Sequence, residues 1–310
     1  MANSSHQHNK TTVFEGYALS DCIAWLTLYG IEAVAIVILN VLIIVTYLKV
    51  SSLRKRNMYL IINLAVVDMF VGGTIVYHCL FVGSSNCNFW EIKNFTRVDE
   101  MDWGLWIAFA LYQFFPAASI TNLAAISLER MHATFRPWKH RIIKRKMFGA
   151  AIATVWLTAG LCIAAIISLC LLKYNLFSVI EIYFSFFLFC LFIILVSYVS
   201  IAIKMGCGNP PLNHGAVIRE RKLTKTLFIV TVLSLLLLLP RTIVWFLGKA
   251  VQIFDPISDR TMWNFSCFTV WLLYANSLVN PILYAFRIPE FKRGLLVFQS
   301  KSEPVQVYSL

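Results

Sequence analysis

The side chain with the most distinctive chemistry is that of Asp68, in the middle of a long apolar stretch. An ionised carboxylate in hydrocarbon costs about 2.5–3.5 kcal/mol on insertion scales, so we expect Asp68 to face an internal cavity with polar partners. Other apolar stretches carry amides and hydroxyls at a similar depth: Asn40, Ser119, Asn276, Ser277 and Asn280. These groups predict a small polar cavity fit for a cation, with a sodium site at Asp68, Ser119, Asn276 and Asn280. The alternative is a neutral aspartic acid that serves packing alone.

The other reactive side chains indicate neither zinc binding nor catalysis. The eight cysteines form no CxxC pair and no ligand spacing with histidines. Catalysis needs His, Asp or Glu clustered at one depth, whereas His78, His132 and His140 are scattered along the chain. We therefore expect no enzyme activity and no cofactor other than an allosteric sodium ion.

The lipid bilayer sets the type and length of the helices that position these residues. Of the 310 residues, 59% are apolar and 14% are charged, and the mean hydropathy is +0.72. Soluble proteins have about 25% charged residues, so a water-exposed surface is excluded. The apolar blocks are long enough to cross a hydrocarbon core of about 30 Å. They predict an all-α membrane protein, a seven-transmembrane helix bundle with spans at 23–49, 59–84, 102–134, 147–171, 179–205, 220–250 and 261–286.

The charge distribution orients the chain in the membrane. Arginine and lysine gather after the first, third and fifth spans, and the positive-inside rule places these segments in the cytoplasm. The opposite loops are richer in acidic residues, and that side carries the N-glycosylation sequons Asn3, Asn9, Asn94 and Asn264. We therefore expect the N-terminus outside the cell. The net charge of +12 reflects the inner loops, and no nucleic-acid motif accompanies it.

This topology divides the chain into three parts. They are an extracellular tail at 1–22, a transmembrane domain at 23–286, and a membrane-surface helix with a cytoplasmic tail at 287–310. The polar N-terminal tail lacks the apolar core of a cleavable signal peptide, so the first span is expected to target the chain. A transporter would show inverted repeats or helices broken near the midplane, and the sequence displays neither.

Signature positions over nearly the whole chain resemble those of rhodopsin-like (class A) G-protein-coupled receptors. In chain order they are Asn40; Asn63-Leu64-Ala65-Val66-Val67-Asp68; Glu129-Arg130-Met131; Trp156; Tyr198; Pro240; and Asn280-Pro281-Ile282-Leu283-Tyr284. Seven matches in the right order are far more specific than any one of them. The segment 286–292 resembles the short amphipathic helix that the family places on the membrane surface. The resemblance implies a plasma-membrane receptor whose partners are an extracellular ligand and a heterotrimeric G protein.

The same resemblance implies an activation switch. Its residues are Glu129, Arg130, Tyr198, Glu220, Pro240, Asn280, Pro281 and Tyr284. In this mechanism Arg130 pairs with Glu129 and with Glu220, which holds the cytoplasmic ends of the helices together at rest. An agonist favours an arrangement with the sixth span swung outward about Pro240, and a G-protein helix enters the opened crevice. The alternative for Arg130 and Glu220 is a pair of interfacial charges among lipid headgroups.

Three positions depart from the family pattern. Leu105 replaces the cysteine that usually bridges the third span to the second outer loop. Cys190 replaces a common proline of the fifth span, and Leu238 replaces the tryptophan two residues before Pro240. With the short second outer loop, these departures resemble the melanocortin, lysophospholipid and cannabinoid receptor cluster.

The missing cysteine leaves the extracellular disulfide open. The outer side is oxidising, so a bridge between Cys22 and Cys267 at the outer ends of the first and seventh spans is one candidate. Cys87 and Cys170 are further candidates. Free buried thiols are the alternative for any chosen pair.

The family pattern places the ligand in the outer half of the bundle. The expected lining is Tyr112, Gln113, Tyr183, Arg241, Thr242, Trp245 and Tyr274. Tyr112 stands where amine receptors have an aspartate, and Tyr274 where opsins have the retinal lysine, which disfavours both ligand types. Arg241 requires a strongly accepting partner, either inside the protein, with Glu181 as the nearest carboxylate, or on the ligand. A small amphiphile, a lipid or a peptide fits, and a constitutively signalling receptor without a dedicated agonist is the alternative.

Overall fold

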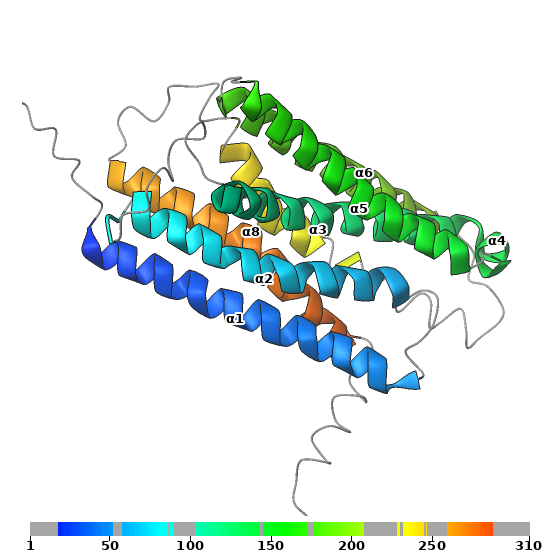
Figure 1. Cartoon of the computed structure of the whole chain (residues 1–310). Helices are drawn as coiled ribbons and strands as arrows, with labels where there is room; N and C mark the ends of the chain where they lie inside the picture. Colours follow the sequence, from blue (N-terminus) through cyan, green and yellow to red (C-terminus); the bar gives the residue numbers. More distant parts are fainter. Residues whose placement is uncertain are drawn as a thin grey trace, which may run out of the picture.

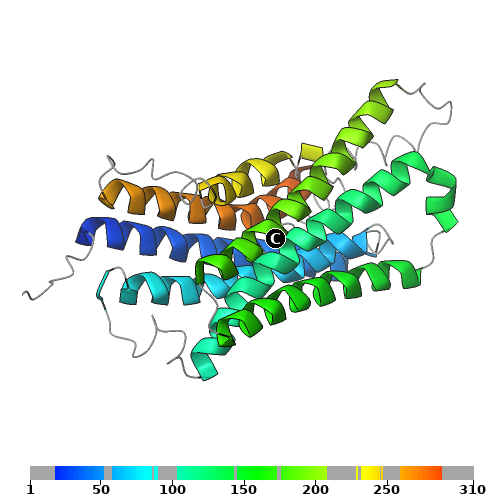
Figure 2. The same cartoon turned by 90° about the horizontal axis from the view of Figure 1, so that it is seen from above.

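The structure of the chain is a computed structural model. It describes residues 18–51, 58–85, 87–89, 103–142, 145–172, 176–207, 228–229, 232–244, 246 and 259–287. Within these ranges the regular structure is helical and includes no β-strand. Figure 1 and Figure 2 show the long helices side by side in one elongated bundle.

Among the residues that the structure describes, six helices are long and apolar enough to cross a membrane. They are α1 (Leu19–Lys49), α2 (Tyr59–Ser85), α3 (Trp103–Phe135), α5 (Arg145–Leu171), α6 (Leu176–Cys207) and α8 (Asp259–Arg287). A short helix, α4 (Pro137–Ile142), follows α3, and a shorter apolar helix, Val232–Val244, lies within the sixth predicted span. The prediction of an all-α, seven-helix transmembrane bundle is confirmed.

The helix boundaries differ from the predicted spans at several ends. Because α1 begins at Leu19, the predicted N-terminal tail 1–22 includes the first turn of a helix. α5 begins at Arg145 and α6 at Leu176, both before the predicted spans, because a helix can extend past the hydrocarbon core when its end residues reach water. The amphipathic helix predicted at 286–292 lies outside the described residues after Arg287.

Each spanning helix has one face toward the protein and one toward lipid, and α1 is an example. Tyr29, Ile36 and Ile43 recur at seven-residue spacing and are buried, whereas Ile31 and Val34 are exposed. Side chains at this spacing share one face of a helix. Because lipid is as apolar as these side chains, close packing and hydrogen bonds between helices hold the bundle together.

Gly72 allows α1 and α2 to approach closely. A Cβ atom at this position would lie 2.8 Å from Val37 Cγ2 and 3.0 Å from the carbonyl oxygen of Ala33. Any larger residue would push the two helices apart. The close contact fixes how deep α2, and therefore Asp68, lies against α1.

A set of polar side chains ties α2, α3 and α5 together in the inner half of the bundle. Asn63 Nδ2 donates to Asn122 Oδ1 at 3.3 Å, and Trp156 Nε1 donates to Asn63 Oδ1 at 3.1 Å. Asn122 Nδ2 in turn donates to the carbonyl oxygen of Leu60 at 2.9 Å. Two signature residues of the sequence, Asn63 and Trp156, therefore hold three helices in register around Asp68 and Arg130.

Candidate functional site

Asp68 lies at the centre of a fully buried hydrogen-bond network, here called the Asp68 network. Ser119 Oγ and Ser277 Oγ donate to Asp68 Oδ1 at 2.7 and 2.8 Å, and Asn280 Nδ2 donates to Oδ2 at 2.8 Å. The donors come from α3 and α8, and Asp68 has no exposed surface. Three donors on one carboxyl group are suited to the charged form, since a carboxylate only accepts hydrogen bonds. Ser119 and Asn280, two residues of the predicted cation site, therefore lie within hydrogen-bond distance of Asp68, and cation binding there stays a prediction.

Asn276, the fourth residue of the predicted cation site, lies beside the Asp68 network. Its Oδ1 atom is buried without a hydrogen-bond partner among the described residues. It lines a cavity of about 10 Å³, together with Ser119, Ser277 and Tyr274. This volume is of the order needed for one small guest such as a water molecule. Asn40, also predicted for this cavity, instead donates to the carbonyl oxygen of Ser277 at 3.1 Å and ties α1 to α8.

The C-terminal end of α3 holds a second charged group, here called the Arg130 cluster. Arg130 is 2% exposed, and its Nε and Nη2 atoms donate to the two carboxylate oxygens of Glu129. His140 Nε2 lies 2.7 Å from Glu129 Oε1. The short helix α4 begins with Pro137, which suits the first position of a helix, and it brings His140 back onto α3. Arg130 is therefore held by a carboxylate that two helices position.

The other predicted switch residues lie around the inner half of the bundle. Tyr198 and Tyr284 are buried, and the Tyr198 ring packs against Phe228 with centroids 5.7 Å apart. The Tyr284 hydroxyl is buried without a partner among the described residues. Pro240 is half-buried within the helix Val232–Val244. Glu220 lies outside the described residues, so its contact with Arg130 stays a prediction.

Asn280 and Pro281 lie one after the other within α8. The donation from Asn280 to Asp68 fixes this part of α8 against α2. Pro281 lies inside the helix, where it cannot donate the usual backbone hydrogen bond. The pair therefore joins the Asp68 network to a deformable part of α8, one turn before Tyr284.

The outer half of the bundle contains an aromatic group centred on His78, here called the His78 cluster. The His78 ring stacks on Tyr112 with an interplanar angle of 3°, and their hydrogen-bonding atoms, Nδ1 and the hydroxyl, are 3.3 Å apart. Tyr29 and Tyr274 make edge contacts with His78, with centroids 4.9 and 5.7 Å away. Tyr29 also donates to the carbonyl oxygen of Cys267 at 2.8 Å. Four helices therefore meet around one imidazole.

Arg241 belongs to the same half of the bundle. It is half-buried, and Nη1 donates to Ser266 Oγ at 3.0 Å. A hydroxyl partner satisfies a donor but neutralises no charge. Trp245, expected beside Arg241, lies outside the described side chains.

The remaining predicted ligand residues make contacts within the bundle. Tyr183 donates to the backbone carbonyl of Gln113 at 3.0 Å, and its ring packs on Phe187 with centroids 4.8 Å apart. Thr242 donates to the carbonyl oxygen of Leu239 at 2.8 Å and has no exposed surface. Of the predicted lining, Tyr112 and Tyr274 lie around His78, whereas Arg241 bonds Ser266 and Thr242 bonds within its own helix.

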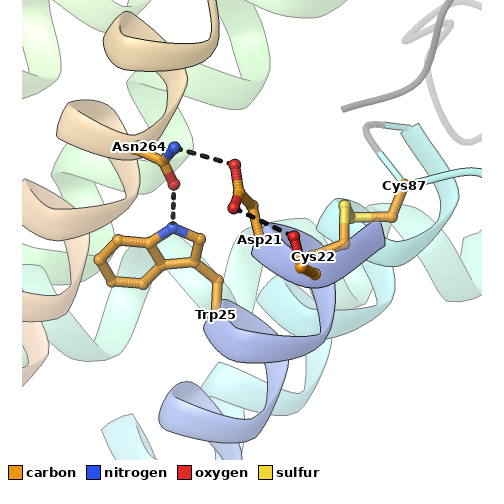
Figure 3. Close-up of a disulfide and its surroundings, with 6 residues drawn as sticks. Asp21, Cys22, Trp25, Cys87 and Asn264 are labelled. Carbon is orange, nitrogen blue, oxygen red and sulfur yellow. Dashed lines mark hydrogen bonds between the residues drawn. A yellow bond between two sulfur atoms is a disulfide. The ribbon is translucent and has the colours of Figure 1, made fainter. Parts of the chain in front are cut away.

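A disulfide joins Cys22 at the start of α1 to Cys87 just after α2 (Figure 3). Their Cα atoms are 5.9 Å apart. The N–H of Cys87 donates to the carbonyl oxygen of Val82, so the chain turns at the end of α2 and places Cys87 beside α1. The candidate bridge between Cys22 and Cys267 is wrong, because Cys267 is a free buried thiol, as is Cys170.

A polar group beside this disulfide ties α1 to α8 (Figure 3). Arg260 Nε and Nη2 donate to the two carboxylate oxygens of Asp21 at 2.6 and 2.8 Å. Asn264 Nδ2 donates to Asp21 at 3.1 Å, and Trp25 Nε1 donates to Asn264 Oδ1 at 2.6 Å. We call these four residues and the disulfide the clamp. It binds the outer end of α1 to both of its neighbours.

One residue of the clamp, Asn264, is also a predicted glycosylation site. The amide nitrogen of Asn264 is the atom that would carry a glycan, and it donates to Asp21. A glycan at Asn264 would replace one of the two hydrogens on this nitrogen, so only one N–H would remain to donate to Asp21. Asn3, Asn9 and Asn94 lie outside the described residues, and glycosylation at all four sites stays a prediction.

The predicted site residues omitted three members of these clusters: Tyr29, His78 and His140. The expectation of scattered histidines is wrong for the inner pair, because the rings of His132 and His140 are 5.9 Å apart. His78 continues a buried stripe of α2, at three- and four-residue steps after Val71 and Ile75. That spacing was visible in the sequence, whereas the return of α4 onto α3 was not.

Comparison with known proteins places this arrangement in a family. A family model described as 7 transmembrane receptor (rhodopsin family) matches residues 39–284. The chain is 24% identical over 263 residues to melanocortin receptor 5 of Mus musculus, covering 82% of this chain and 77% of the relative. It is 24% identical over 327 residues to the substance-K receptor of Canis lupus familiaris, covering 94% of this chain and 79% of the relative.

The two relatives do not settle the predicted subgroup. Melanocortin receptor 5 falls in the predicted cluster, whereas the substance-K receptor is named for a different ligand, and the two are equally similar to this chain. The family model covers Asn40, the Asp68 network, the Arg130 cluster and Tyr284. With the helical bundle and the order of these sites, it shows that the chain belongs to the rhodopsin family of seven-transmembrane receptors.

Proposed function

We propose that this receptor transmits an extracellular ligand signal to heterotrimeric G proteins by outward movement of its sixth helix. The observation that carries the proposal is the burial of Arg130 and its pairing with Glu129 at the cytoplasmic end of α3. A guanidinium that gives up one carboxylate needs another acceptor, and a G-protein helix offers backbone carbonyls. The Arg130 cluster thus acts as a latch: the contact between Arg130 and Glu129 holds the resting state, and its release opens the cytoplasmic side of the bundle.

The residues around the latch support a two-state mechanism. Pro240 lacks an N–H for the helix ladder, so it provides a hinge in the sixth helix. Release of Arg130 from Glu129 lets the hydroxyls of Tyr198 and Tyr284 turn toward it. Both tyrosines are buried in the inner half of the bundle, so small rotations suffice. A ligand drives the change only to the extent that it binds the open arrangement better than the closed one.

The orientation belongs to the same proposal. The basic loops support a cytoplasmic position for the Arg130 end, and the sequons support an extracellular N-terminus. The disulfide Cys22–Cys87 lies at the opposite end of the bundle from Arg130, which agrees with an oxidising exterior. Epitope tags at each terminus, stained on intact and permeabilised cells, test the assignment. An N-terminal tag hidden on intact cells overturns it.

The chemistry of the outer half favours a ligand with an acidic or strongly accepting group. The partner of Arg241 among the described residues is a neutral hydroxyl, which leaves the charge of the guanidinium suited to an acidic group on a ligand. The tyrosines of the His78 cluster offer flat apolar faces in the same half of the bundle. A small amphiphile, a lipid or a short peptide with a carboxylate meets both demands. The relatives are named as receptors for melanocortins and for substance K.

A sodium ion fits the Asp68 network chemically. Asp68 supplies a carboxylate, and Asn276 and Asn280 each have a buried Oδ1 atom without a partner among the described residues. Hard cations take such oxygen ligands. Bound there, the ion would balance the charge of Asp68 and favour the resting state. Replacing sodium by potassium should raise basal G-protein activation in the wild type and leave Asp68→Asn unchanged, and an equal response in both overturns the site.

G-protein activation sensors in cells test the coupling directly. Glu220→Ala should raise ligand-independent activation, because it removes the second predicted partner of Arg130. The surface expression of the variant is matched to that of the wild type. Unchanged basal activity contradicts the role of Glu220. High basal activity in the wild type, with no response to amine, nucleoside, lipid or peptide libraries, supports the alternative of a constitutive receptor.

The same sensors test the ligand anchor once an agonist is found. Arg241→Gln should weaken the agonist by about a hundredfold, because a buried charge pair is replaced by a neutral contact. Arg260→Gln is the matched control, because that arginine is exposed and bonds Asp21. An agonist with equal potency on Arg241→Gln and the wild type rules out the anchor.

A further inference from the structure

A groove of about 570 Å³ lies between α3, α5 and α6, at a distance from the His78 cluster. Figure 2 shows these three helices running alongside one another. The exposed side chains Leu128, Met147 and Phe189 line the groove, so it opens to the outside of the bundle. Ala125 and Ala151 on its wall leave the space that larger residues would fill. Its volume falls in the range of small-molecule sites, about 300–1,000 Å³.

The wall of the groove is suited to a hydrocarbon chain. Two of its three threonines satisfy their hydroxyls locally, since Thr121 donates to the carbonyl oxygen of Ala117 at 2.7 Å and Thr154 to that of Ala150 at 2.9 Å. Apart from Thr158, the rest of this part of the wall is apolar. A surface of this kind within a membrane-spanning bundle meets lipid and not water, so the bilayer must supply what fills it.

The length of the groove matches one leaflet. On α3 it runs from Thr121 to His132, and on α5 from Met147 to Thr158. At 1.5 Å per residue each wall is about 17 Å long. Half of a hydrocarbon core of about 30 Å is about 15 Å. An acyl chain of the leaflet next to Arg130 therefore spans the groove from end to end.

The end of the groove near Arg130 is polar and surrounded by positive charge. Glu129, His132 and His140 line it, and the exposed Arg145 and Lys146 directly precede its wall residues on α5. The exposed Arg136 and Lys139 flank the return of the chain through α4. Basic residues at this depth attract anionic headgroups of the cytoplasmic leaflet. The charge of the rim thus complements a phosphate and disfavours a cationic guest.

We propose that this groove binds one anionic phospholipid of the cytoplasmic leaflet, with an acyl chain along α3, α5 and α6 and its phosphate at the basic rim. The guest contacts the Arg130 cluster directly, because Glu129 and His140 form the polar end of the groove. Binding of the lipid in the groove therefore affects how strongly Glu129 is held in its contacts with Arg130 and His140. A membrane lipid then acts on the latch from the side, independently of any ligand in the outer half.

Native mass spectrometry of the purified full-length receptor tests the binding. The receptor is released from nanodiscs of phosphatidylcholine with a minor fraction of phosphatidylserine, and the retained lipids are counted by headgroup. The wild type should retain one phosphatidylserine. Ala151→Leu fills the groove and should lower this retention by about tenfold, as expected when the chain loses contacts of about two methylenes. Arg145→Gln with Lys146→Gln should lower it by about tenfold through the lost charges.

Matched controls separate the groove from general effects. Ala153→Leu makes the same change on the lipid face of α5 outside the groove, and Lys49→Gln with Lys204→Gln removes two exposed charges elsewhere at the cytoplasmic end. Both should retain phosphatidylserine as the wild type does. If Ala151→Leu fails to fold, Thr154→Phe fills the same groove, with Leu157→Phe as its control.

Three results overturn the proposal. They are equal retention in the groove variants and their controls, equal retention of phosphatidylcholine and phosphatidylserine, and displacement of the phospholipid by cholesterol. The measurement needs neither G protein nor agonist. The lipid site is therefore tested apart from signalling, and its failure would leave the proposed coupling untouched.

Discussion

The two ends of the bundle hold their helices in different ways. At the end where α1 begins, the Cys22–Cys87 disulfide and the pair between Asp21 and Arg260 join α1 to its neighbours. At the opposite end, Arg130 is held without a covalent bond, by Glu129 alone among the contacts described there. Arg130 is 2% exposed, whereas Arg260 is 60% exposed. The covalent link between helices is thus at one end of the bundle. The buried arginine, whose hydrogen bonds can be exchanged for others, is at the other end.

The difference identifies which end can act as a switch. A charge-assisted hydrogen bond contributes about 1.5–3 kcal/mol, which is of the size that differential ligand binding can offset. Moving a two-state equilibrium from 1:99 to 99:1 takes about 5.5 kcal/mol. Free energies of this size from ligand binding cannot break a disulfide. The clamp therefore keeps α1, α2 and α8 together while the inner ends of the helices rearrange.

The largest expected effect comes from removing the disulfide. Cys22→Ser with Cys87→Ser should lower the free energy of unfolding by about 2–5 kcal/mol, because the bridge closes a loop between residues 65 positions apart. Thermal unfolding of the purified receptor in detergent measures the loss. Cys79→Ser, which changes a free thiol on α2, should leave the transition unchanged. A double variant as stable as that control would mean that the disulfide does not hold the outer end.

A smaller effect is expected from the inner end. His140→Ala removes the only contact described between α4 and the carboxylate of Glu129, which leaves Glu129 less well oriented toward Arg130. Basal G-protein activation should rise by about threefold to tenfold, since part of one charge-assisted hydrogen bond is lost. Ile142→Ala, on the same short helix and exposed, is the control. A fall in basal activity would mean that His140 competes with Arg130 for the carboxylate and does not position it.

The inner end was predicted far better than the outer end, for a physical reason. Glu129 and Arg130 are neighbours in the sequence. Depth in the membrane named the three donors to Asp68 among its candidates, although it also named Asn40 and Asn276, which do not bond the carboxylate. Depth is readable from apolar runs, because the bilayer sets the length of each span. Asp68 and Asn280 therefore converge as expected although they are 212 positions apart.

The outer contacts depend on geometry that no local pattern encodes. Cys22 pairs with Cys87 because the chain turns after α2, where Asn88 adopts a left-handed conformation with φ of 53°. The amount of that turn decides whether Cys87 comes within reach of α1. The rotation of each helix about its axis likewise decides that Tyr29 and Tyr112 face His78. These angles follow from packing between helices, as at Gly72, and not from hydropathy.

The smallest effect is expected from the ion pair of the clamp. Asp21→Asn should lower the thermal transition by much less than loss of the disulfide, because the partner, Arg260, is largely exposed and water competes for its donors. The amide of Asn264 still finds an oxygen acceptor on the new side chain. High salt should erase the difference from the wild type, since salt screens exposed charges over about 10 Å or less. Adding Arg260→Gln to Asp21→Asn should cost nothing further if the two act as a pair. If Asp21→Asn instead lowers the thermal transition as much as loss of the disulfide does, and high salt does not restore it, the charges of the clamp hold the outer end. The two ends of the bundle would then not differ in the way described, with a covalent link at one and an ion pair at the other.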